Sequence, residues 1–318
     1  MMLLNEMLGI KYPIIQGGMT SISDGRFAAS ISNAGGLGVI ASGHWDKEKV
    51  REEIHILKTL TNKPYGLNVF MMSPYVEDII DLAIEEAVPV VTTGAHSPEK
   101  YIRRLKDAGI KVFPVISSVT LAKRISRYGI DGIIAEGMES GGHVGEATTM
   151  ALLPQMIREL DVPVIAAGGI GSGSQLASVL AMGGVGIQIG TILLASEEAP
   201  VHPNYKEAII KARDNDTVVI LKNTGAPVRV LKNRLTRKYL DMERKNIIDE
   251  DLLAFEKEAL KKGIFEGDLD MGCMPLGQIA GLVREIKPVG QILDDIMNEA
   301  FEATKALNDS INRLKGGN

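Results

Sequence analysis

The feature that most constrains the fold of this chain is a repeat in its first two thirds, where short apolar runs alternate with amphipathic stretches of helical spacing. The apolar runs cover residues 13–17, 37–40, 65–70, 89–93, 111–116, 131–135, 163–167 and 186–190. In the first unit, Asp24 is positioned as an N-cap and Gly35 as the end of the helix. Runs that are apolar on both faces and are joined through helices predict a parallel sheet.

Eight successive units favour closure of that sheet into a barrel. A doubly wound open sheet is the alternative, but the pattern has no break at which the strand order would reverse. The segment 169–174 resembles a dinucleotide fingerprint, yet Ser174 occupies the third glycine position and the unit is the seventh of eight. We therefore expect an α/β protein with a (β/α)8 TIM barrel.

The pattern changes after residue 195. The sequence then predicts helical material at 202–213, a strand at 217–221, a basic run, two acidic helices within 241–262, a glycine-rich return at 263–281 and a helical tail at 289–314. We expect residues 197–274 to form a smaller, mostly helical cap inserted after strand eight. Residues 1–196 would form the barrel, completed by 275–318. An apolar stripe on the tail is expected to pack on the barrel: Ile292, Ile296, Ala300 and Leu307.

Composition excludes several classes of protein. The 318 residues are 45% hydrophobic and 24% charged, with a net charge of -5, which is typical of a globular protein with a sizeable core. The charge argues against a nucleic-acid partner, and no apolar run approaches the roughly 20 residues that span a membrane. Residues 1–11 do not resemble an export signal, and Cys273 is the only cysteine. We expect a cytoplasmic location and a buried, unreactive Cys273.

The segment 135–145 places one histidine among glycines directly after an apolar run. Histidine titrates near neutrality, and glycines let the backbone approach a ligand closely. A loop histidine that bonds only to the backbone is the alternative. The segment follows strand six on the face of the barrel where active sites lie, so His143 is the catalytic candidate.

Glycines also end strands seven and eight, whose following loops most often bind phosphate in barrels. These positions are Gly168 and Gly169 after strand seven and Gly190 and Thr191 after strand eight, with Gln188 nearby. Backbone amides from such loops and from a helix N-terminus favour a dianion. The alternative is that these glycines only shape turns.

The ends of strands one and three carry Gly17, Gly18, Met19 and Asn68. Small residues, a thioether and an amide are suited to a flat heteroaromatic ring over the barrel mouth. The alternatives are that Gln16 or Asn68 satisfies backbone groups and that Met19 is a core residue. A ring, a phosphate and a catalytic histidine together indicate a flavin mononucleotide (FMN) site.

The residues that carry these signals resemble the flavin-dependent enoyl-[acyl-carrier-protein] reductase II group, within the larger set that includes nitronate monooxygenases. Segments 13–19, 34–38, 63–68, 91–95, 135–145, 166–170 and 188–191 resemble both activities, whereas 202–206, 232–237 and 277–282 are similar to the reductase branch. The resemblance implies flavin contacts at Gly17, Gly18, Met19 and Asn68, phosphate contacts at Gly168, Gly169, Gly190 and Thr191, Gln188 nearby, and His143 as catalytic residue. It also implies a homodimer that responds to a monovalent cation, but we identify no cation or metal ligands.

The reaction that the resemblance implies is a hydride relay from NADH or NADPH, through FMN, to a trans-2-enoyl thioester. Nitronate oxidation and non-catalytic flavin binding are the alternatives. The thioester would arrive on an acidic acyl carrier protein, and we expect Arg234, Arg237 and Lys238 to contribute a basic docking patch on the cap. A solvated helix face, a dimer contact or an ion pair with the acidic stretch 241–251 would explain the same charges.

Overall fold

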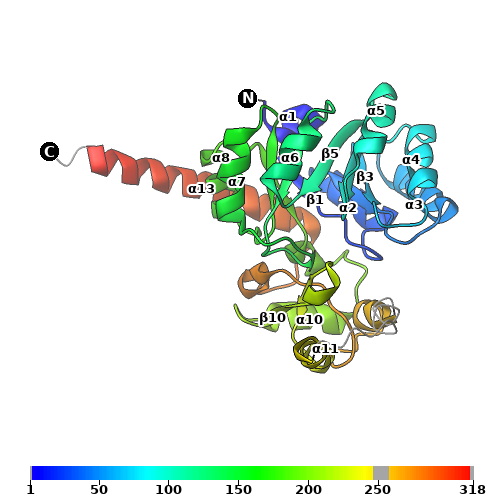
Figure 1. Ribbon diagram of the computed structural model, residues 1–318. Coiled ribbons are helices and arrows are strands. Elements are labelled where there is room, and N and C mark those ends of the chain that lie inside the picture. Colours follow the sequence, from blue (N-terminus) through cyan, green and yellow to red (C-terminus); the bar gives the residue numbers. More distant parts are fainter. Residues whose placement is uncertain (1, 246–257, 316–318) are drawn as a thin grey trace.

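The computed structural model describes residues 2–245 and 258–315. Parallel strands form an almost closed barrel in the order β1-β9-β8-β6-β5-β4-β3-β2, so the predicted (β/α)8 barrel is confirmed (Figure 1). The strands are β1 (Ile14–Gln16), β2 (Gly38–Ala41), β3 (Tyr65–Phe70), β4 (Val90–Gly94), β5 (Lys111–Ile116), β6 (Ile133–Glu136), β8 (Val164–Ala167) and β9 (Gly186–Ile189).

The seam between β1 and β2 is closed partly by a side chain. An isolated parallel bridge joins Ile15 to Leu37, and the buried amide of Gln16 fills in beside it. Gln16 Oε1 accepts from the Val39 amide at 2.8 Å, and Gln16 Nε2 donates to Ser23 Oγ at 3.1 Å. Gln16 is therefore a strand-end residue that satisfies backbone groups.

Helices surround the barrel and follow the sequence signals closely. The Asp24 side chain caps the first of them by accepting from the Phe27 amide, and Gly35 ends it in the left-handed region at φ 105°. The surrounding helices are α2 (Gly25–Ala34), α3 (Lys47–Leu60), α4 (Val76–Glu85), α5 (Glu99–Asp107), α6 (Val119–Ser126), α7 (Thr149–Glu159) and α8 (Gly173–Ala181).

The core has an inner and an outer part because successive side chains of a strand point to opposite faces. The inner cluster fills the barrel with large apolar side chains such as Ile15, Phe113, Ile134 and Ile165. Helix α1 (Leu4–Leu8) closes its amino-terminal end with Leu4 and Leu8. The outer cluster lies between strands and helices. This division shows which strand residues face the barrel interior.

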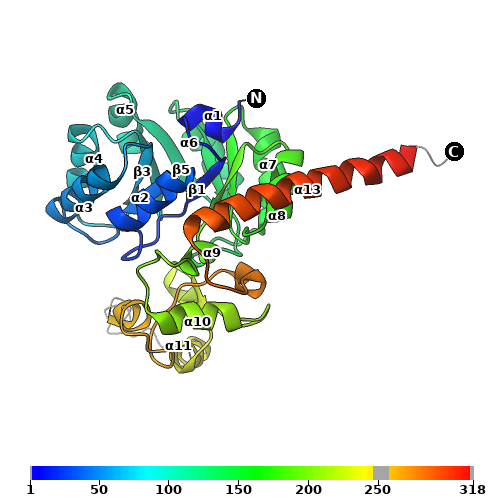
Figure 2. The ribbon, with the colours of Figure 1, turned by 180° about the vertical axis from the view of Figure 1, so that it is seen from behind.

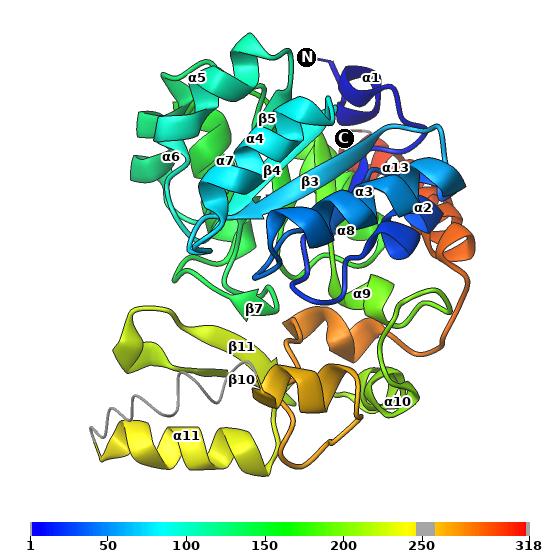
Figure 3. The ribbon, with the colours of Figure 1, turned by 90° about the vertical axis from the view of Figure 1, so that its right-hand side faces the viewer.

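The sequence predicts a mostly helical cap, but the structure also contains an antiparallel sheet there. Strand β7 (Gly142–His143) leaves the barrel loop and joins β11 (Val228–Leu231) and β10 (Thr217–Ile220) in an antiparallel sheet (Figure 3). The strand predicted at 217–221 is confirmed, and Cys273 is buried in the apolar cluster behind it. Other elements here are α9 (Thr191–Leu194), α10 (Pro203–Lys211), η1 (Lys222–Thr224), α11 (Arg234–Arg244) and η2 (Gln278–Leu282). Residues 246–257, within the two predicted acidic helices, lie outside the described residues.

The C-terminal helix α13 (Val289–Lys315) packs on the barrel over only half its length. Its first half lies against α2 and α8 and buries Ile292, Ile296 and Ala300. Its second half projects away from the molecule, as Figure 2 shows. The prediction that Leu307 packs on the barrel is wrong, since that side chain is 47% exposed. Although α13 is 27 residues long, neither it nor another helix in residues 2–245 and 258–315 is apolar enough to cross a membrane.

Candidate active site

At the carboxyl ends of the strands, the apolar filling of the barrel gives way to polar side chains. Their neighbours along each strand belong to the outer cluster, so alternation turns the polar groups into the barrel. One pair bonds directly, with Asn68 Nδ2 donating to Thr92 Oγ1 at 2.9 Å. The polar residues that form this floor of the barrel mouth are Asn68, Thr92, Glu136 and Gln188.

The glycines that end β1 lie directly against this floor. A Cβ atom on Gly18 would overlap the Asn68 side chain, and one on Gly17 would lie 3.8 Å from Gln188 Cγ. The structure therefore brings together three of the residues predicted to line a flat ring, Gly17, Gly18 and Asn68, and places Gln188 beside them. Because neither glycine carries a side chain, the backbone after β1 can pack directly against the floor.

Gln188 is the clearest sign of a ligand on this floor. Its side chain is 7% exposed, and its Oε1 atom makes no hydrogen bond within the described residues. A buried acceptor without a donor costs free energy comparable to a lost hydrogen bond. The N–H groups of a heteroaromatic ring would satisfy it.

The loops after β6 and β8 meet beside the floor. Gly168 and Gly169 have φ angles of +87° and +69°, and Cβ atoms there would lie 2.6 Å from Gly137 O and 2.8 Å from Glu139 Cβ. Both glycines are thus required by backbone conformation and by packing. Their presence alone does not indicate a phosphate.

Gly190 is different from these two glycines. Its φ is -134°, and a Cβ atom there would meet only Met19 Sδ, at 3.6 Å. The protein itself does not require a glycine at this position. The contact also places Met19, another predicted ring residue, beside the predicted phosphate loop.

The N-terminus of α8, which the sequence suggested for the phosphate, already holds a carboxylate. The Gly173 amide donates to Glu299 Oε2 at 2.8 Å, and Ser174 Oγ donates to Oε1 at 3.0 Å. Glu299 belongs to α13, which could not be foreseen from the α8 sequence. The remaining predicted positions are the turns at Gly169 and Gly190 and the neighbouring Thr191, whose Oγ1 accepts from the Gly277 amide at 3.0 Å.

His143 lies in a strand and not in a free loop. Its segment β7 pairs with β11 in the register His143 to Val228 and Gly142 to Arg229. The Val144 amide extends the contact by donating to Pro227 O at 3.0 Å. The cap therefore fixes the backbone of the catalytic candidate from a segment more than 80 residues away in the sequence.

The imidazole of His143 lies tilted beside the Phe70 ring at the end of β3. Its ring centroid is 6.0 Å from that of Phe70, and Phe70 in turn meets His44 edge-on at 5.2 Å. The side chain is accessible to solvent but surrounded by protein, and this burial lowers its pKa, with His44 adding a smaller effect of the same sign. His143 is therefore mainly neutral at neutral pH and can donate through a ring N–H.

Glu136 is a site residue that the sequence reasoning did not single out. It ends β6 two residues after the inward-facing Ile134, so alternation turns its carboxyl into the mouth. Burial raises the pKa of Glu136 to about 8; the nearby Ser140 hydroxyl offsets part of the rise without reaching hydrogen-bond geometry. The carboxyl is therefore mostly protonated at pH 7. The position of Glu136 two residues after Ile134 is the sequence signal that could have identified it as facing the mouth.

Arg229 was also missed, because it looked like part of an exposed basic run. It is 4% exposed in β11, where its Nε donates to Met138 O at 3.0 Å and its Nη1 to Thr217 Oγ1 at 3.1 Å. Desolvation lowers the pKa of Arg229, and Glu139 opposes this effect. Arg229 thus ties the loop before His143 to the cap.

The proposed docking residues lie on α11, which lies on the side of the cap farthest from the barrel (Figure 3). Arg234, Arg237 and Lys238 are all exposed. Arg234 Nη1 is 3.6 Å from Asp270 Oδ2, and Arg237 Nε donates to Asn233 O at 3.4 Å. The patch is therefore accessible, but the structure separates it from His143 by the strands of the cap sheet.

Comparison with known proteins places this site in a family. The family model described as nitronate monooxygenase matches residues 2–299. A probable nitronate monooxygenase of Staphylococcus saprophyticus is 35% identical over 81% of this chain and 87% of its own. A Rhodococcus jostii protein named (3aS,4S,5R,7aS)-5-hydroxy-7a-methyl-1-oxo-octahydro-1H-indene-4-carboxyl-CoA dehydrogenase is 31% identical over 96% of this chain and 97% of its own.

Among solved structures, FabK from Thermotoga maritima is 45% identical and superimposes with a TM-score of 0.94 over 96% of this chain and 98% of its own. A nitroalkane oxidase from Streptomyces ansochromogenes is 28% identical, with a TM-score of 0.83 over 94% and 98%. The matches extend through both the barrel and the cap. The chain belongs to the nitronate monooxygenase family, and it is an FMN-dependent oxidoreductase.

Proposed function

We propose that this protein is an enoyl-[acyl-carrier-protein] reductase that uses NADH or NADPH. The observation that carries the proposal is the similarity to FabK, the flavin-dependent reductase of this type, at 45% identity over nearly the whole of both chains. The Rhodococcus relative, whose name also specifies a thioester of a carboxylic acid, supports a substrate of that class.

The residues of the mouth fit FMN. The unpartnered Gln188 Oε1, the amide of Asn68 and the bare backbone of Gly17 and Gly18 suit the edges and face of the ring. The bound flavin would supply hydride transfer from the nicotinamide donor to the β-carbon of the enoyl thioester. Met19 would contact the ring, and the phosphate would lie against the loops of Gly168, Gly169, Gly190 and Thr191.

His143 would act on the substrate. As hydride reaches the β-carbon, negative charge develops on the thioester oxygen and the α-carbon. A neutral imidazole N–H, held in place by the β7–β11 pairing, can donate to that oxygen. Such a positioned donor or acid typically contributes about 10² to 10⁴ in rate.

Glu136 and Arg229 would assist this chemistry in two different ways. A protonated Glu136 can donate a hydrogen bond into the mouth, whereas a carboxylate could only accept one. Arg229 would keep the His143 strand in register by holding Met138 O. We further propose acyl carrier protein as the donor of the substrate, docking on Arg234, Arg237 and Lys238.

The decisive assay is NADH consumption with a trans-2-enoyl thioester under nitrogen. The proposal predicts one mole of saturated thioester for each mole of NADH. His143→Ala should abolish most of this turnover while retaining flavin. Failure of holoenzyme to reduce any enoyl thioester, tested with both NADH and NADPH, would refute the proposal.

Nitronate oxidation is the second candidate, because the family model and the Staphylococcus relative bear that name. It needs oxygen and an alkyl nitronate but no nicotinamide donor. Oxygen uptake with a nitronate, together with no anaerobic reduction of enoyl thioester, would favour this activity. Flavin binding with neither activity would indicate a non-catalytic flavin protein.

A further inference from the structure

One row of the barrel mouth carries two polar side chains with a small residue between them. Glu136 on β6 is paired with Ala167 on β8, and Ala167 is paired with Gln188 on β9. Because Ala167 carries only a methyl group, no larger side chain separates Glu136 from Gln188. A third polar group, the hydroxyl of Ser140, lies near the Glu136 carboxyl.

The protein does not satisfy the polar groups of this row. The side chains of Gln188 and Ser140 are only 7% and 8% exposed, yet Gln188 Oε1 and Ser140 Oγ make no hydrogen bond within residues 2–245 and 258–315. Buried polar groups are normally paired, because an unmade hydrogen bond costs free energy. The row is therefore suited to a ligand that supplies the missing partners.

The surroundings of Glu136 keep its carboxyl neutral. The strands on either side of β6 turn the apolar Val115 and Ala167 inward. Of the charged residues nearby, Glu139 accepts from the N-terminus of α7 at 2.9 Å, and Arg229 donates to a backbone carbonyl at 3.0 Å. Burial raises the pKa of Glu136 to about 8, and no charged side chain in the described part of the chain opposes this rise. At pH 7 the row thus offers a hydrogen-bond donor beside an acceptor.

This order of donor and acceptor matches one edge of a flavin. The pyrimidine edge of an oxidised flavin carries an N–H group between two carbonyl groups. A protonated Glu136 complements a carbonyl, and Gln188 Oε1 complements the neighbouring N–H. An ionised Glu136 would place two acceptors against the same edge and would repel the carbonyl oxygen.

We propose that Glu136 is a flavin-binding residue that donates a hydrogen bond to a ring carbonyl, while Gln188 Oε1 accepts one from the adjacent ring N–H. Ser140 is then a positioning residue, because its hydroxyl acts on the flavin only through the Glu136 carboxyl. Both contacts depend on the proposed fit of FMN to the mouth and hold whichever substrate the enzyme uses.

The first test is titration of the apoprotein with FMN at several pH values. The wild-type Kd should rise about tenfold from pH 7 to pH 9, because ionisation of Glu136 removes the donor and adds a negative charge. Glu136→Gln keeps a neutral donor at every pH, so its Kd should match that of the wild type at pH 7 without this rise. Ionisation of FMN itself affects both proteins equally and cancels in the ratio of their Kd values. A ratio that does not change with pH, or loss of FMN from Glu136→Gln at pH 7, would overturn the proposal.

Ser140→Ala tests the positioning role by the same titration. The Ser140 hydroxyl lowers the pKa of Glu136, so without it the rise in Kd should begin at a higher pH. Thr93→Val is the matched control: Thr93 Oγ1 is also buried without a partner in the described residues, but it follows the inward-facing Thr92 and so lies outside the mouth. Its pH profile should equal that of the wild type. An unchanged midpoint in Ser140→Ala, or a shifted one in Thr93→Val, would overturn the role of Ser140.

The second test identifies the group that Glu136 binds. In 2-thio-FMN and 4-thio-FMN, one ring carbonyl is replaced by a thiocarbonyl, which is a weaker acceptor, and the phosphate is kept. At pH 7 the wild type and Glu136→Gln should both bind one of these analogues several-fold more weakly than FMN, and Glu136→Leu should lose this preference. Equal affinity of the wild type for all three flavins would overturn the proposal. These titrations contain neither NADH nor thioester, so their outcome is separate from that of the enoyl reductase assay.

Discussion

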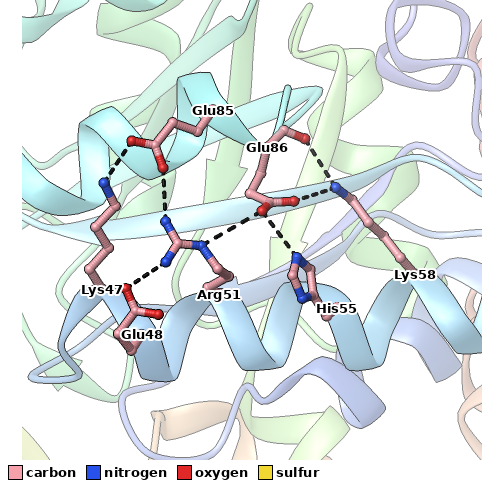
Figure 4. A network of polar contacts seen from close by, with 7 residues as sticks. All are labelled: Lys47, Glu48, Arg51, His55, Lys58, Glu85 and Glu86. Atoms are coloured by element: carbon pink, nitrogen blue, oxygen red, sulfur yellow. Dashed lines mark hydrogen bonds and ion pairs between the residues drawn. The ribbon is translucent and has the colours of Figure 1, made fainter.

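The outer face of α3 and α4 differs from the mouth of the barrel in how its polar side chains are paired. On the outer face, Lys47 and Arg51 lie 2.7 and 2.8 Å from Glu85, and Lys58 lies 2.7 Å from Glu86 (Figure 4). The bonds from Lys47 and Arg51 lower the pKa of Glu85, and those from Lys58 and His55 lower the pKa of Glu86. The charges are satisfied within the protein.

In the mouth, polar groups are buried without such partners. Gln188 Oε1 and Ser140 Oγ make no hydrogen bond within the described residues, and burial raises the pKa of Glu136 to about 8. Folding alone does not explain this arrangement, because buried polar groups are normally paired. The comparison teaches that the outer face pairs its charges within the protein, whereas the mouth combines the paired Asn68 and Thr92 with an unpartnered Gln188 Oε1 that is suited to a ligand.

The largest expected effect comes from the exposed reactive group of the mouth. His143→Ala should lower enoyl reduction by at least about a hundredfold, because the donor to the developing negative charge is lost. Reduction of the flavin by NADH, followed by stopped-flow absorbance, should change far less. If the variant lost its flavin but turned over normally once reconstituted, His143 would be structural.

Gly190 tests the mouth without disturbing the fold. Gly190→Val should weaken FMN binding by about tenfold or more, because its side chain would obstruct the approach of a phosphate to the backbone. The Cβ atom meets only Met19 Sδ at 3.6 Å, so the unfolding midpoint of the apoprotein should change little. Gly290→Ala, where a Cβ atom meets nothing within 4 Å, is the matched control. Unchanged FMN affinity in Gly190→Val would mean that Gly190 only makes a turn.

Glu136 is expected to make the stability of the protein depend on pH. Its pKa in the folded protein lies above the ordinary value of 4.5, so its contribution to stability is full below about pH 4.5 and is lost as pH rises through about 8. Glu136→Gln removes this dependence. Between pH 5 and 8, the free energy of unfolding of the wild-type apoprotein should fall relative to the variant by at least about 1.4 kcal/mol, equivalent to one pK unit. Parallel pH profiles of the two proteins in urea denaturation would contradict a protonated Glu136 carboxyl.

The exposed positive side chains of α11 belong neither to the paired outer face of α3 and α4 nor to the mouth. Reversing the charges of Arg234, Arg237 and Lys238 should raise the KM for enoyl-carrier-protein several-fold at low salt, because electrostatic steering is lost. High salt should erase the difference. The KM for a short enoyl thioester without the protein serves as control and should not change. Equal effects on both substrates would remove the docking role.

The smallest effect is expected on the paired face. Glu85→Gln removes the carboxylate shared by Lys47 and Arg51, but exposed ion pairs contribute little. FMN affinity should be unaffected, and the unfolding midpoint should move less than in any mouth variant that alters stability. A loss of FMN from Glu85→Gln would break the division between the two regions.

The sequence predicted the barrel because alternation of strands and helices is a local pattern, and the barrel rule then placed Gly17, Asn68 and Gln188 at one mouth. Long-range pairing was beyond that reasoning. The strand at His143 exists only because β11 lies beside it, and Arg229 looked exposed until its strand was seen to be buried. Leu307 continues the apolar spacing of α13, but this spacing does not show where the helix leaves the barrel.

The unpartnered Gln188 Oε1 is the group of the mouth most directly suited to a flavin, and Gln188→Leu tests this role with two readouts. Removing a buried amide whose Oε1 has no partner should stabilise the apoprotein, while loss of the acceptor should weaken FMN binding by about tenfold. Calorimetric titration of FMN and urea denaturation of the same apoprotein measure both. Opposite shifts are predicted. Unchanged or tighter FMN binding, or a destabilised apoprotein, would contradict the account.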